Sequence, residues 1–281
     1  MTLVIATRRK NRIQFASDSR LTFLPGQFVD CGIKIFEVPV KIIKFKVNPK
    51  QNPSYTETII YDHTWGMAFA GSSTNAYLIK EIALQIFSQL STSLTLKEVK
   101  LDDICQYLLH ITKKISDQLI PILQSKGIVK FLISGFCPEA KQTKVFLFEF
   151  KLENQLFSPS FEEIDLQEGE TLCFGSGNAK ANEIGLKTNI LRTLKEVIES
   201  DDESVGGKMQ FGEFNDQNNF EVKRLSETYK DGQQWKSKIT VATFDLLKDN
   251  MTAYKYKPGH KSRIAFDEEW KEFLKTQNLK K

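Results

Sequence analysis

The chain has 281 residues, of which 41% are hydrophobic and 26% charged. This length suits one large domain or two modest ones, with enough apolar residues for a substantial core. The formal net charge of +4 is small and dispersed, which argues against a nucleic-acid-binding protein. The sequence shows neither the roughly 18 consecutive apolar residues of a membrane-spanning helix nor the residue order of a secretory signal. We therefore expect a soluble cytoplasmic protein without membrane or nucleic-acid partners.

The cysteine and histidine residues show no metal-ligand spacing. Four cysteines lie far apart without a CxxC pair, and the three histidines are equally scattered: Cys31, Cys105, Cys137, Cys173, His63, His110 and His260. A chain of this size needs no disulfide framework, so reduced thiols are expected. We predict no metal site and no cofactor.

The chain begins with a predicted hairpin. The apolar-rich runs 3–6 and 12–17 flank the polar tip 8–11, which is typical of two antiparallel strands. Further strands are predicted at 33–36, 38–47, 58–61, 65–70, 131–136, 144–150, 171–174, 208–214 and 220–225. Residues 48–53, with two prolines and two asparagines, are predicted to form a loop.

Three segments have the apolar spacing of helices: 72–90, 101–123 and 179–199. Acidic residues near the start of the second and Gly127 just beyond its end support its limits. The order is sheet, two helices, sheet, helix and hairpin, unlike the regular strand-helix alternation of a doubly wound parallel fold. It predicts an α+β structure of stacked sheets between helical layers.

Thr2 is the first candidate for chemistry. After removal of Met1, one residue would carry both a hydroxyl and a free α-amine, and the amine can act as the base that activates the hydroxyl. Its reference pKa of about 7.7–8.0 suits this role near neutral pH. Many proteins begin Met-Thr, however, so Thr2 indicates a nucleophile only in combination with the residues that follow.

Those residues occur in the order of a known family. The opening MTLVIATRRKNRIQFASDSRLT is followed by KIIKF (41–45), AFAGSSTNA (68–76), FLISGF (131–136), FGSGNAKA (174–181) and DDESVGGKMQF (201–211). This ordered set resembles proteasome β-type subunits, and especially the bacterial proteasome-like threonine peptidases. The resemblance covers about residues 2–225. It implies a four-layer αββα sandwich of two mainly antiparallel sheets, the N-terminal nucleophile hydrolase fold, with a C-terminal extension at 226–281.

The resemblance also assigns roles to residues. Thr2 would be the nucleophile, the Gly71 amide would stabilise the oxyanion, and Asp18 would orient a catalytic lysine. That lysine would be Lys41, with Lys34 in the similar run IKIF as its rival. The supporting residues would be Ser176, Asp201 and Ser204, and the substrate-binding residues would be Thr22, Phe69 and Ser73. Alternatively, Asp18, Gly71 and Ser176 are ordinary turn residues, and Asp201 and Ser204 end or cap a helix.

The function implied is a threonine endopeptidase that cleaves polypeptides through an acyl-enzyme. Two alternatives remain: an inert assembly subunit, and an N-terminal nucleophile amidohydrolase of a small amide. The implied partners are further copies of the chain in a ring or stacked assembly, and an ATPase unfoldase. Three features depart from the family. They are an extra loop around 48–55, room for one helix instead of two between Ser176 and Asp201, and an unmatched tail after Ser226. The large ring of Phe69 would favour small or medium substrate side chains.

Overall fold

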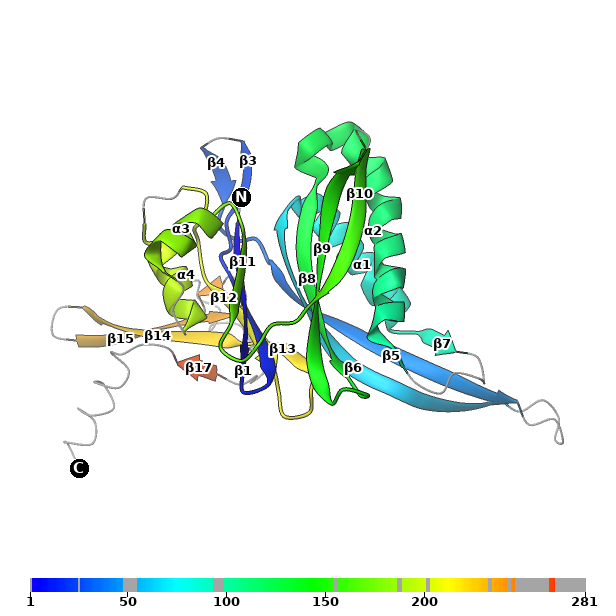
Figure 1. Cartoon of the computed structure of the whole chain (residues 1–281). Coiled ribbons are helices and arrows are strands. Elements are labelled where there is room, and N and C mark those ends of the chain that lie inside the picture. Colours follow the sequence, from blue (N-terminus) through cyan, green and yellow to red (C-terminus); the bar gives the residue numbers. More distant parts are fainter. Residues whose placement is uncertain are drawn as a thin grey trace, which may run out of the picture.

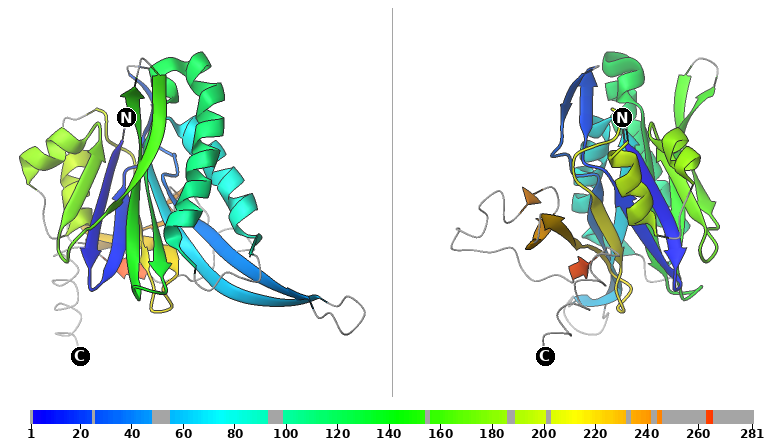
Figure 2. Two further views of the ribbon diagram at one scale, coloured as in Figure 1. Left: turned by 45° about the vertical axis from the view of Figure 1, so that its right-hand side comes forward. Right: turned by 90° about the vertical axis from the view of Figure 1, so that its left-hand side faces the viewer.

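The computed structural model describes residues 2–24, 26–47, 55–92, 99–153, 156–185, 189–200, 203–231, 234–241, 244–245 and 263–265. The predicted loop at 48–53 lies outside these residues, as do Met1 and Asp201. Two sheets form the body of the molecule, and helices cover the outer face of each (Figures 1 and 2).

The first sheet has six strands in the order β10-β9-β8-β6-β5-β7. Their bounds are β5 Ile35–Val47, β6 Tyr55–Gly71, β7 Leu90–Thr92, β8 Val129–Cys137, β9 Gln142–Glu153 and β10 Leu156–Ile164. All neighbours are antiparallel except β5 and β7. The sequence predicted β8 and β9 as a hairpin, and this is confirmed. It divided β5 and β6 into two runs each, whereas each is one continuous strand, and Pro39 lies within β5.

The second sheet has five strands in the order β11-β1-β2-β12-β13. Their bounds are β1 Leu3–Arg9, β2 Arg12–Ser17, β11 Thr171–Gly175, β12 Gln210–Phe214 and β13 Phe220–Val222. The predicted N-terminal hairpin is confirmed, with Arg9 opposite Arg12. Its two turn residues, Lys10 and Asn11, both have positive φ (52° and 58°), as in the type I′ turn that suits the twist of paired strands.

Helices α1 (Ser73–Phe87) and α2 (Leu101–Leu123) pack on the six-stranded sheet, and α2 is followed by the short η1 (Gln124–Gly127). Helices α3 (Asn178–Ile184) and α4 (Ile190–Ile198) pack on the five-stranded sheet. The prediction of one helix over 179–199 is wrong. Helix α3 ends at Ile184 and is capped by Gly185, whose φ of +86° is a conformation that glycine adopts without steric cost.

Three apolar clusters show how the layers stack. One lies between α1, α2 and the six-stranded sheet, and another between α3, α4 and the five-stranded sheet. The third joins the inner faces of the two sheets, and includes Val4 and Phe15 from one and Ala68 and Leu132 from the other. The predicted α+β architecture of stacked sheets and helical layers is therefore confirmed.

The remaining strands lie outside the two main sheets. Strands β3 (Leu21–Leu24) and β4 (Gln27–Val29) pair with each other, and a four-stranded sheet contains β14 (Arg224–Asp231), β15 (Gln234–Val241), β16 (Phe244–Asp245) and β17 (Arg263–Ala265). Strand β14 crosses the predicted domain boundary at 225, and Leu225 packs with the core beneath α3 and α4. The boundary itself stays a prediction.

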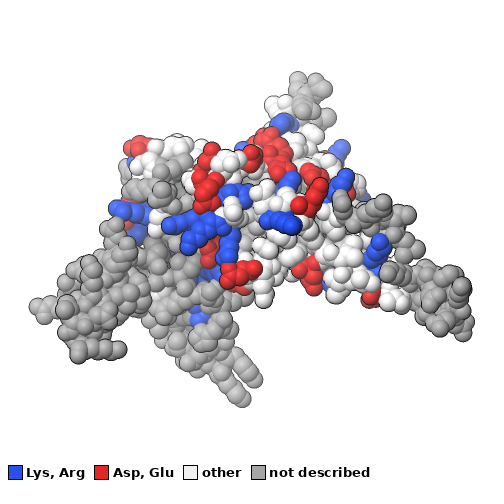
Figure 3. Space-filling model, turned by 60° about the horizontal axis from the view of Figure 1, so that its bottom comes forward, with Lys and Arg blue, Asp and Glu red and all other residues white. Residues whose placement is uncertain are grey.

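The surface carries charges of both signs. In the face shown in Figure 3, basic and acidic side chains are interspersed over the described residues, without a broad patch of one sign. None of the helices in the described part of the chain is long and apolar enough to cross a membrane.

Candidate active site

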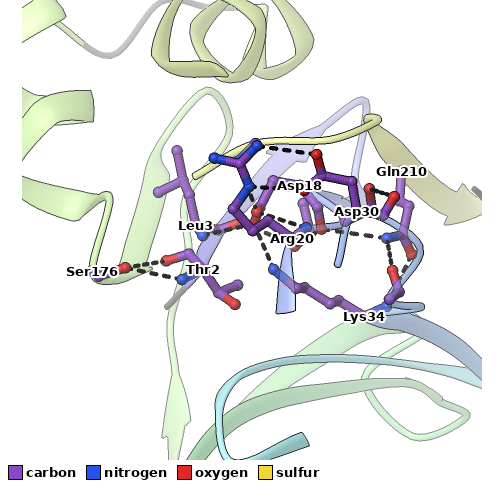
Figure 4. A network of polar contacts seen from close by, with 12 residues as sticks. Thr2, Leu3, Asp18, Arg20, Asp30, Lys34, Ser176 and Gln210 are labelled. Carbon is purple, nitrogen blue, oxygen red and sulfur yellow. Dashed lines mark hydrogen bonds and ion pairs between the residues drawn. The ribbon is translucent and has the colours of Figure 1, made fainter. Parts of the chain in front are cut away.

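Thr2 lies at the entrance to β1 and is 1% exposed. Its backbone nitrogen donates a hydrogen bond of 2.9 Å to Ser176 Oγ, and its carbonyl oxygen accepts from the Gly177 amide at 3.3 Å. Pairing of β1 with β11 brings these groups together, because Leu3 lies opposite Gly175 at the end of β11. Figure 4 shows Ser176 facing the backbone of Thr2. The structure thus brings together two residues that are 174 positions apart in the sequence.

Asp18 follows β2 directly and is fully buried, and its carboxylate accepts four hydrogen bonds from described residues. Its Oδ1 accepts from the Leu3 amide and from Lys34 Nζ, both at 2.9 Å. Its Oδ2 accepts from the amides of Arg20 at 3.1 Å and Gly206 at 3.2 Å. A buried carboxylate is costly unless it is paired and hydrogen-bonded, and Asp18 meets both conditions. It also ties the strand that carries Thr2 to the lysine.

The lysine beside Asp18 is Lys34, not Lys41. Both side chains of the Lys34–Asp18 pair are fully buried, and in Figure 4 the Lys34 ammonium extends toward Thr2. Lys41 lies seven residues further on, within β5, which corresponds to about 23 Å of extended chain. As the partner of Asp18, Lys41 is therefore corrected to Lys34, because β5 carries Lys41 away from the strand ends where Thr2 and Asp18 lie. Which of the two lysines acts in catalysis stays a prediction.

Burial lowers the pKa of Lys34, and the neighbouring Asp18 carboxylate offsets part of this effect. The ammonium group is the charged form of lysine, so loss of water disfavours it while the nearby negative charge favours it. Lys34 is thus buried and bound to the same Asp18 oxygen that accepts from the amide of Leu3, the residue next to Thr2.

Gly71 ends β6 at the point where α1 begins. Its φ is +96°, and an added Cβ would lie 2.6 Å from the Ile128 carbonyl oxygen, so this turn requires glycine. Ser72 caps α1, accepting a hydrogen bond from the Asn75 amide. A Cβ added to Gly175 would lie 2.1 Å from the Thr2 carbonyl oxygen and 3.3 Å from Ala70 Cβ, so the β6 end lies beside Thr2. A helix N-terminus next to a nucleophile is a suitable place to stabilise an anion.

Ser204 lies in the turn that leads to Gly206, whose amide donates to Asp18. Asp201 lies outside the described residues. The predicted substrate-binding residues occupy different surroundings. Ser73 begins α1, and Thr22 lies in β3 with a buried hydroxyl that has no hydrogen-bond partner among the described residues.

Phe69 is fully buried on the helix-facing side of the six-stranded sheet. Its ring stacks on Phe36, with centroids 5.8 Å apart, and meets Tyr77 edge-on at the same distance. The expected pocket-lining residue thus fills space within a packed aromatic cluster. The part that it plays toward a substrate stays a prediction.

The sequence reasoning missed an ion pair beside Asp18. The Arg20 guanidinium binds both carboxylate oxygens of Asp30, at 2.8 and 3.0 Å, and lies 3.7 Å from the centre of the Phe28 ring. It also donates to the Glu203 carbonyl oxygen at 3.1 Å. The hydrogen bonds that Arg20 donates to the Asp30 carboxylate raise the pKa of Arg20. No local pattern links residues 20, 30 and 203, so the sequence alone offered no signal for this contact.

No protein-family model matches the sequence, and no curated protein matches it significantly. Solved structures do resemble it. The subunit in the "Helical Assembly of the Anbu Complex from Pseudomonas aeruginosa" aligns with a TM-score of 0.51 at 13% identity, over 99% of this chain and 96% of that chain. Anbu (ancestral beta-subunit) from Yersinia bercovieri gives a TM-score of 0.46 at 13% identity, over 78% and 86%. An Anbu Gly-1 mutant from Hyphomicrobium sp. strain MC1 gives 0.46 at 12% identity, over 100% and 98%.

These comparisons correct the identification made from the sequence. The Pseudomonas aeruginosa structure, with its TM-score of 0.51, is an Anbu protein, which is proteasome-like but belongs to a distinct family, so the assignment to proteasome β-type subunits or bacterial proteasome-like peptidases is wrong. Short motifs such as the GSG turn reflect backbone geometry, which different families of one fold can share. The expected ATPase partner rested on that assignment and loses its support. At 13% identity, the likeness establishes a proteasome-like fold.

Proposed function

We propose that this chain is an N-terminal nucleophile hydrolase with an Anbu-like fold, in which Thr2 attacks peptide bonds once Met1 has been removed. The observation that carries the proposal is the fully buried Lys34–Asp18 pair at 2.9 Å, in which Asp18 also accepts from the amide of Leu3, the residue that follows Thr2. A charged lysine without access to water is costly to maintain, and such groups concentrate at functional sites.

The chemistry follows from the position of each group. The free α-amine of Thr2 would take the proton from its own hydroxyl while Oγ forms a bond to the substrate carbonyl carbon. The carbon–nitrogen bond then breaks, and the leaving amine takes that proton from the α-ammonium. Water, activated by the same amine, attacks the resulting ester, releases the acid and restores the Thr2 hydroxyl.

The other groups support this sequence electrostatically. The Lys34 ammonium would favour negative charge on Thr2 Oγ and the neutral, basic form of the α-amine. Asp18 holds Lys34 in place, and Ser176 fixes the nitrogen of Thr2 through their 2.9 Å hydrogen bond. The Gly71 amide, at the start of α1, is assigned to the oxyanion. Ser204 is assigned a supporting role through the turn that holds Asp18.

We propose that the substrate is a polypeptide and that copies of the chain assemble, as the Anbu complex from Pseudomonas aeruginosa does in its helical assembly. Enclosing the nucleophile within an assembly would separate it from other proteins. Native mass spectrometry of the purified chain tests this part independently of activity, and a monomer at micromolar concentration would contradict it.

The test of the nucleophile is intact mass spectrometry of the protein before and after treatment with a β-lactone inhibitor. We expect loss of Met1 and one covalent adduct on Thr2, located by peptide mapping. Thr2→Ala should give no adduct and should not hydrolyse fluorogenic peptides. The matched control is Thr7→Val in the same strand, which removes only a hydrogen bond to the Glu170 carbonyl oxygen. It should retain labelling.

Retention of Met1 in folded, assembled protein would refute the proposal and favour an inert assembly subunit. Labelling of Thr2 together with cleavage of small amides but no peptides would refute only the choice of substrate. Equal labelling of the parent and Thr2→Ala would place the reactive group elsewhere.

A further inference from the structure

Gln210 makes contacts on both sides of the Lys34–Asp18 pair. It begins β12 and is 2% exposed. Its Nε2 donates to the carbonyl oxygens of Gly32 at 2.7 Å and Asp18 at 3.3 Å. Its Oε1 accepts from the amides of Lys34 at 2.9 Å and Ile35 at 3.4 Å. Figure 4 shows the Gln210 carboxamide between the segments that carry Asp18 and Lys34.

The chain leaves the two main sheets between these segments. Asp18 follows β2 and Lys34 precedes β5, while the intervening β3 and β4 pair only with each other in the described part of the chain. A two-stranded hairpin is marginally stable by itself and is a weak constraint on the residues at its base. Other contacts must therefore fix the distance between the Asp18 and Lys34 backbones.

Gln210 supplies such contacts from the neighbouring strand. It lies opposite Ser17 in the β2–β12 pair, so its side chain starts beside the residue that precedes Asp18. A second contact joins the two ends of the segment between β2 and β5: the Gly32 amide donates to the Ser19 carbonyl oxygen at 2.9 Å. A primary amide provides two donors and an acceptor on one planar group. Here all of its bonds go to the backbone at the two ends of the segment that joins β2 to β5.

We propose that Gln210 is a positioning residue for the hydrolysis assigned to Thr2: its carboxamide joins the Asp18 and Lys34 backbones at the separation that their buried side-chain pair requires. The expected effect of Gln210 on catalysis rests on the proposed function. Its expected effect on the position of Lys34 rests on the geometry alone. Misplacement of a catalytic group by about 1 Å can reduce a rate by about a hundredfold.

The experiment compares Gln210→Met, which keeps the length of the side chain and removes its hydrogen bonds, with the parent. The matched control is Gln14→Met. Gln14 is a glutamine in β2 that bonds Glu213 of the same β12 strand at 2.9 Å but does not contact the Asp18 or Lys34 backbones. We measure the rate of β-lactone labelling of Thr2, the thermal midpoint and the NMR signal of Lys34 Cε in protein made with labelled lysine. Lys34→Arg assigns that signal.

For Gln210→Met we expect labelling to slow by at least about tenfold and the Lys34 signal to move toward those of exposed lysines. For Gln14→Met we expect neither change, although its thermal midpoint can fall. An unchanged Lys34 signal and labelling rate in folded Gln210→Met would overturn the proposal. If that variant does not fold, Gln210→Glu replaces it, since its carboxylate keeps the acceptor but cannot donate to Gly32 and Asp18.

The two proposals fail in different ways. If the parent protein is not labelled at Thr2, the proposed function fails, and the Lys34 signal still decides whether Gln210 positions the pair. If the parent is labelled but Gln210→Met and Gln210→Glu are labelled equally fast, the proposed function stands and the role of Gln210 is refuted.

Discussion

Lys34 and Asp18 form a pair of opposite charges that is fully buried. The groups around the pair stabilise each of the two charges in a different way. Asp18 accepts three backbone amide hydrogen bonds besides the ion pair. The pKa of Lys34 falls through burial, which Asp18 only partly offsets. Replacing such a pair by apolar residues is often neutral or stabilising, so its presence here favours a role in reactivity over one in stability.

The first prediction, which concerns single residues, distinguishes Lys34 from Lys41 as the catalytic lysine. Lys34→Met should slow β-lactone labelling of Thr2 by at least about a hundredfold, since the positive charge proposed to stabilise Oγ is lost. Lys41→Met, in the same strand region but remote from Asp18, should be labelled as fast as the parent. The reverse pattern would restore Lys41 as the catalytic lysine. Circular dichroism of both variants checks that each is folded.

The second prediction concerns pH. Because burial lowers the pKa of Lys34 below its usual 10.5, the unfolded chain binds more protons than the native one between the lowered value and 10.5. The free energy of unfolding of the parent, relative to Lys34→Met, should therefore rise with pH through that window. The limiting slope is about 1.4 kcal/mol per pH unit. Urea unfolding of both proteins across the alkaline range measures it, and a difference that falls with rising pH would contradict it.

At the scale of elements, the end of β11 supports Thr2. Gly175 has a φ of +102° and lies against the Thr2 carbonyl group, and the next residue, Ser176, contacts the Thr2 nitrogen. Thr2 is thus held by a strand end and a turn that lie far away in the sequence. The N-terminus of α1 also lies near Thr2, because α1 follows the end of β6. Asn75 holds that helix in place by donating to Ser116 Oγ and to the Gly127 carbonyl oxygen.

A third prediction follows for the glycines. Gly175→Ala places a methyl group on the Thr2 carbonyl oxygen, so it should displace Thr2 and abolish labelling. Gly185→Ala has a similar positive φ of +86° but no neighbour within 4 Å of the added atom. It should lose about 1–2 kcal/mol of stability from backbone strain and keep its labelling. Equal labelling of the two variants would show that the β11 end does not position Thr2.

At the scale of the whole molecule, the two sheets meet around Phe220. Its ring lies 5.4 Å from the rings of Phe15 and Phe214. A Cβ added to Gly66 of β6, or to Gly212 of β12, would lie 2.4 Å from this ring, so each sheet contributes a glycine that makes room for it. The side chain of Phe220 therefore joins the sheet of Thr2 to the sheet of Gly71.

The fourth prediction tests this junction. Phe220→Ala should lower the free energy of unfolding by about 3–5 kcal/mol, because a buried aromatic ring is lost and a cavity remains. Phe157→Ala, at a partly exposed phenylalanine in β10, is the control and should cost much less. Urea unfolding measures both. Similar losses in the two variants would show that the sheet junction does not depend on Phe220.

The sequence by itself determined the features that depend on local periodicity and turn chemistry. The hairpin of β1 and β2, helices α1 and α2, and the hairpin of β8 and β9 were all predicted from patterns within about twenty residues. The order of these elements also indicated stacked sheets and helical layers. Where the pattern was ambiguous the prediction was wrong: apolar spacing continued through Gly185, so two helices were predicted as one.

Only the tertiary structure decided which residues meet. Lys34 and Lys41 lie in similar runs, IKIF and KIIKF, and their local patterns do not distinguish them. The choice depends on where β5 begins relative to β2. Gln210, 176 residues from Lys34 in the sequence, is hydrogen-bonded to the backbones of both Lys34 and Asp18. The positions of Thr2 and Ser176 likewise depend on the pairing of the first strand with β11. Such contacts join distant parts of the chain through strand register and buried hydrogen bonds, and these leave no periodic pattern in the sequence around any one residue.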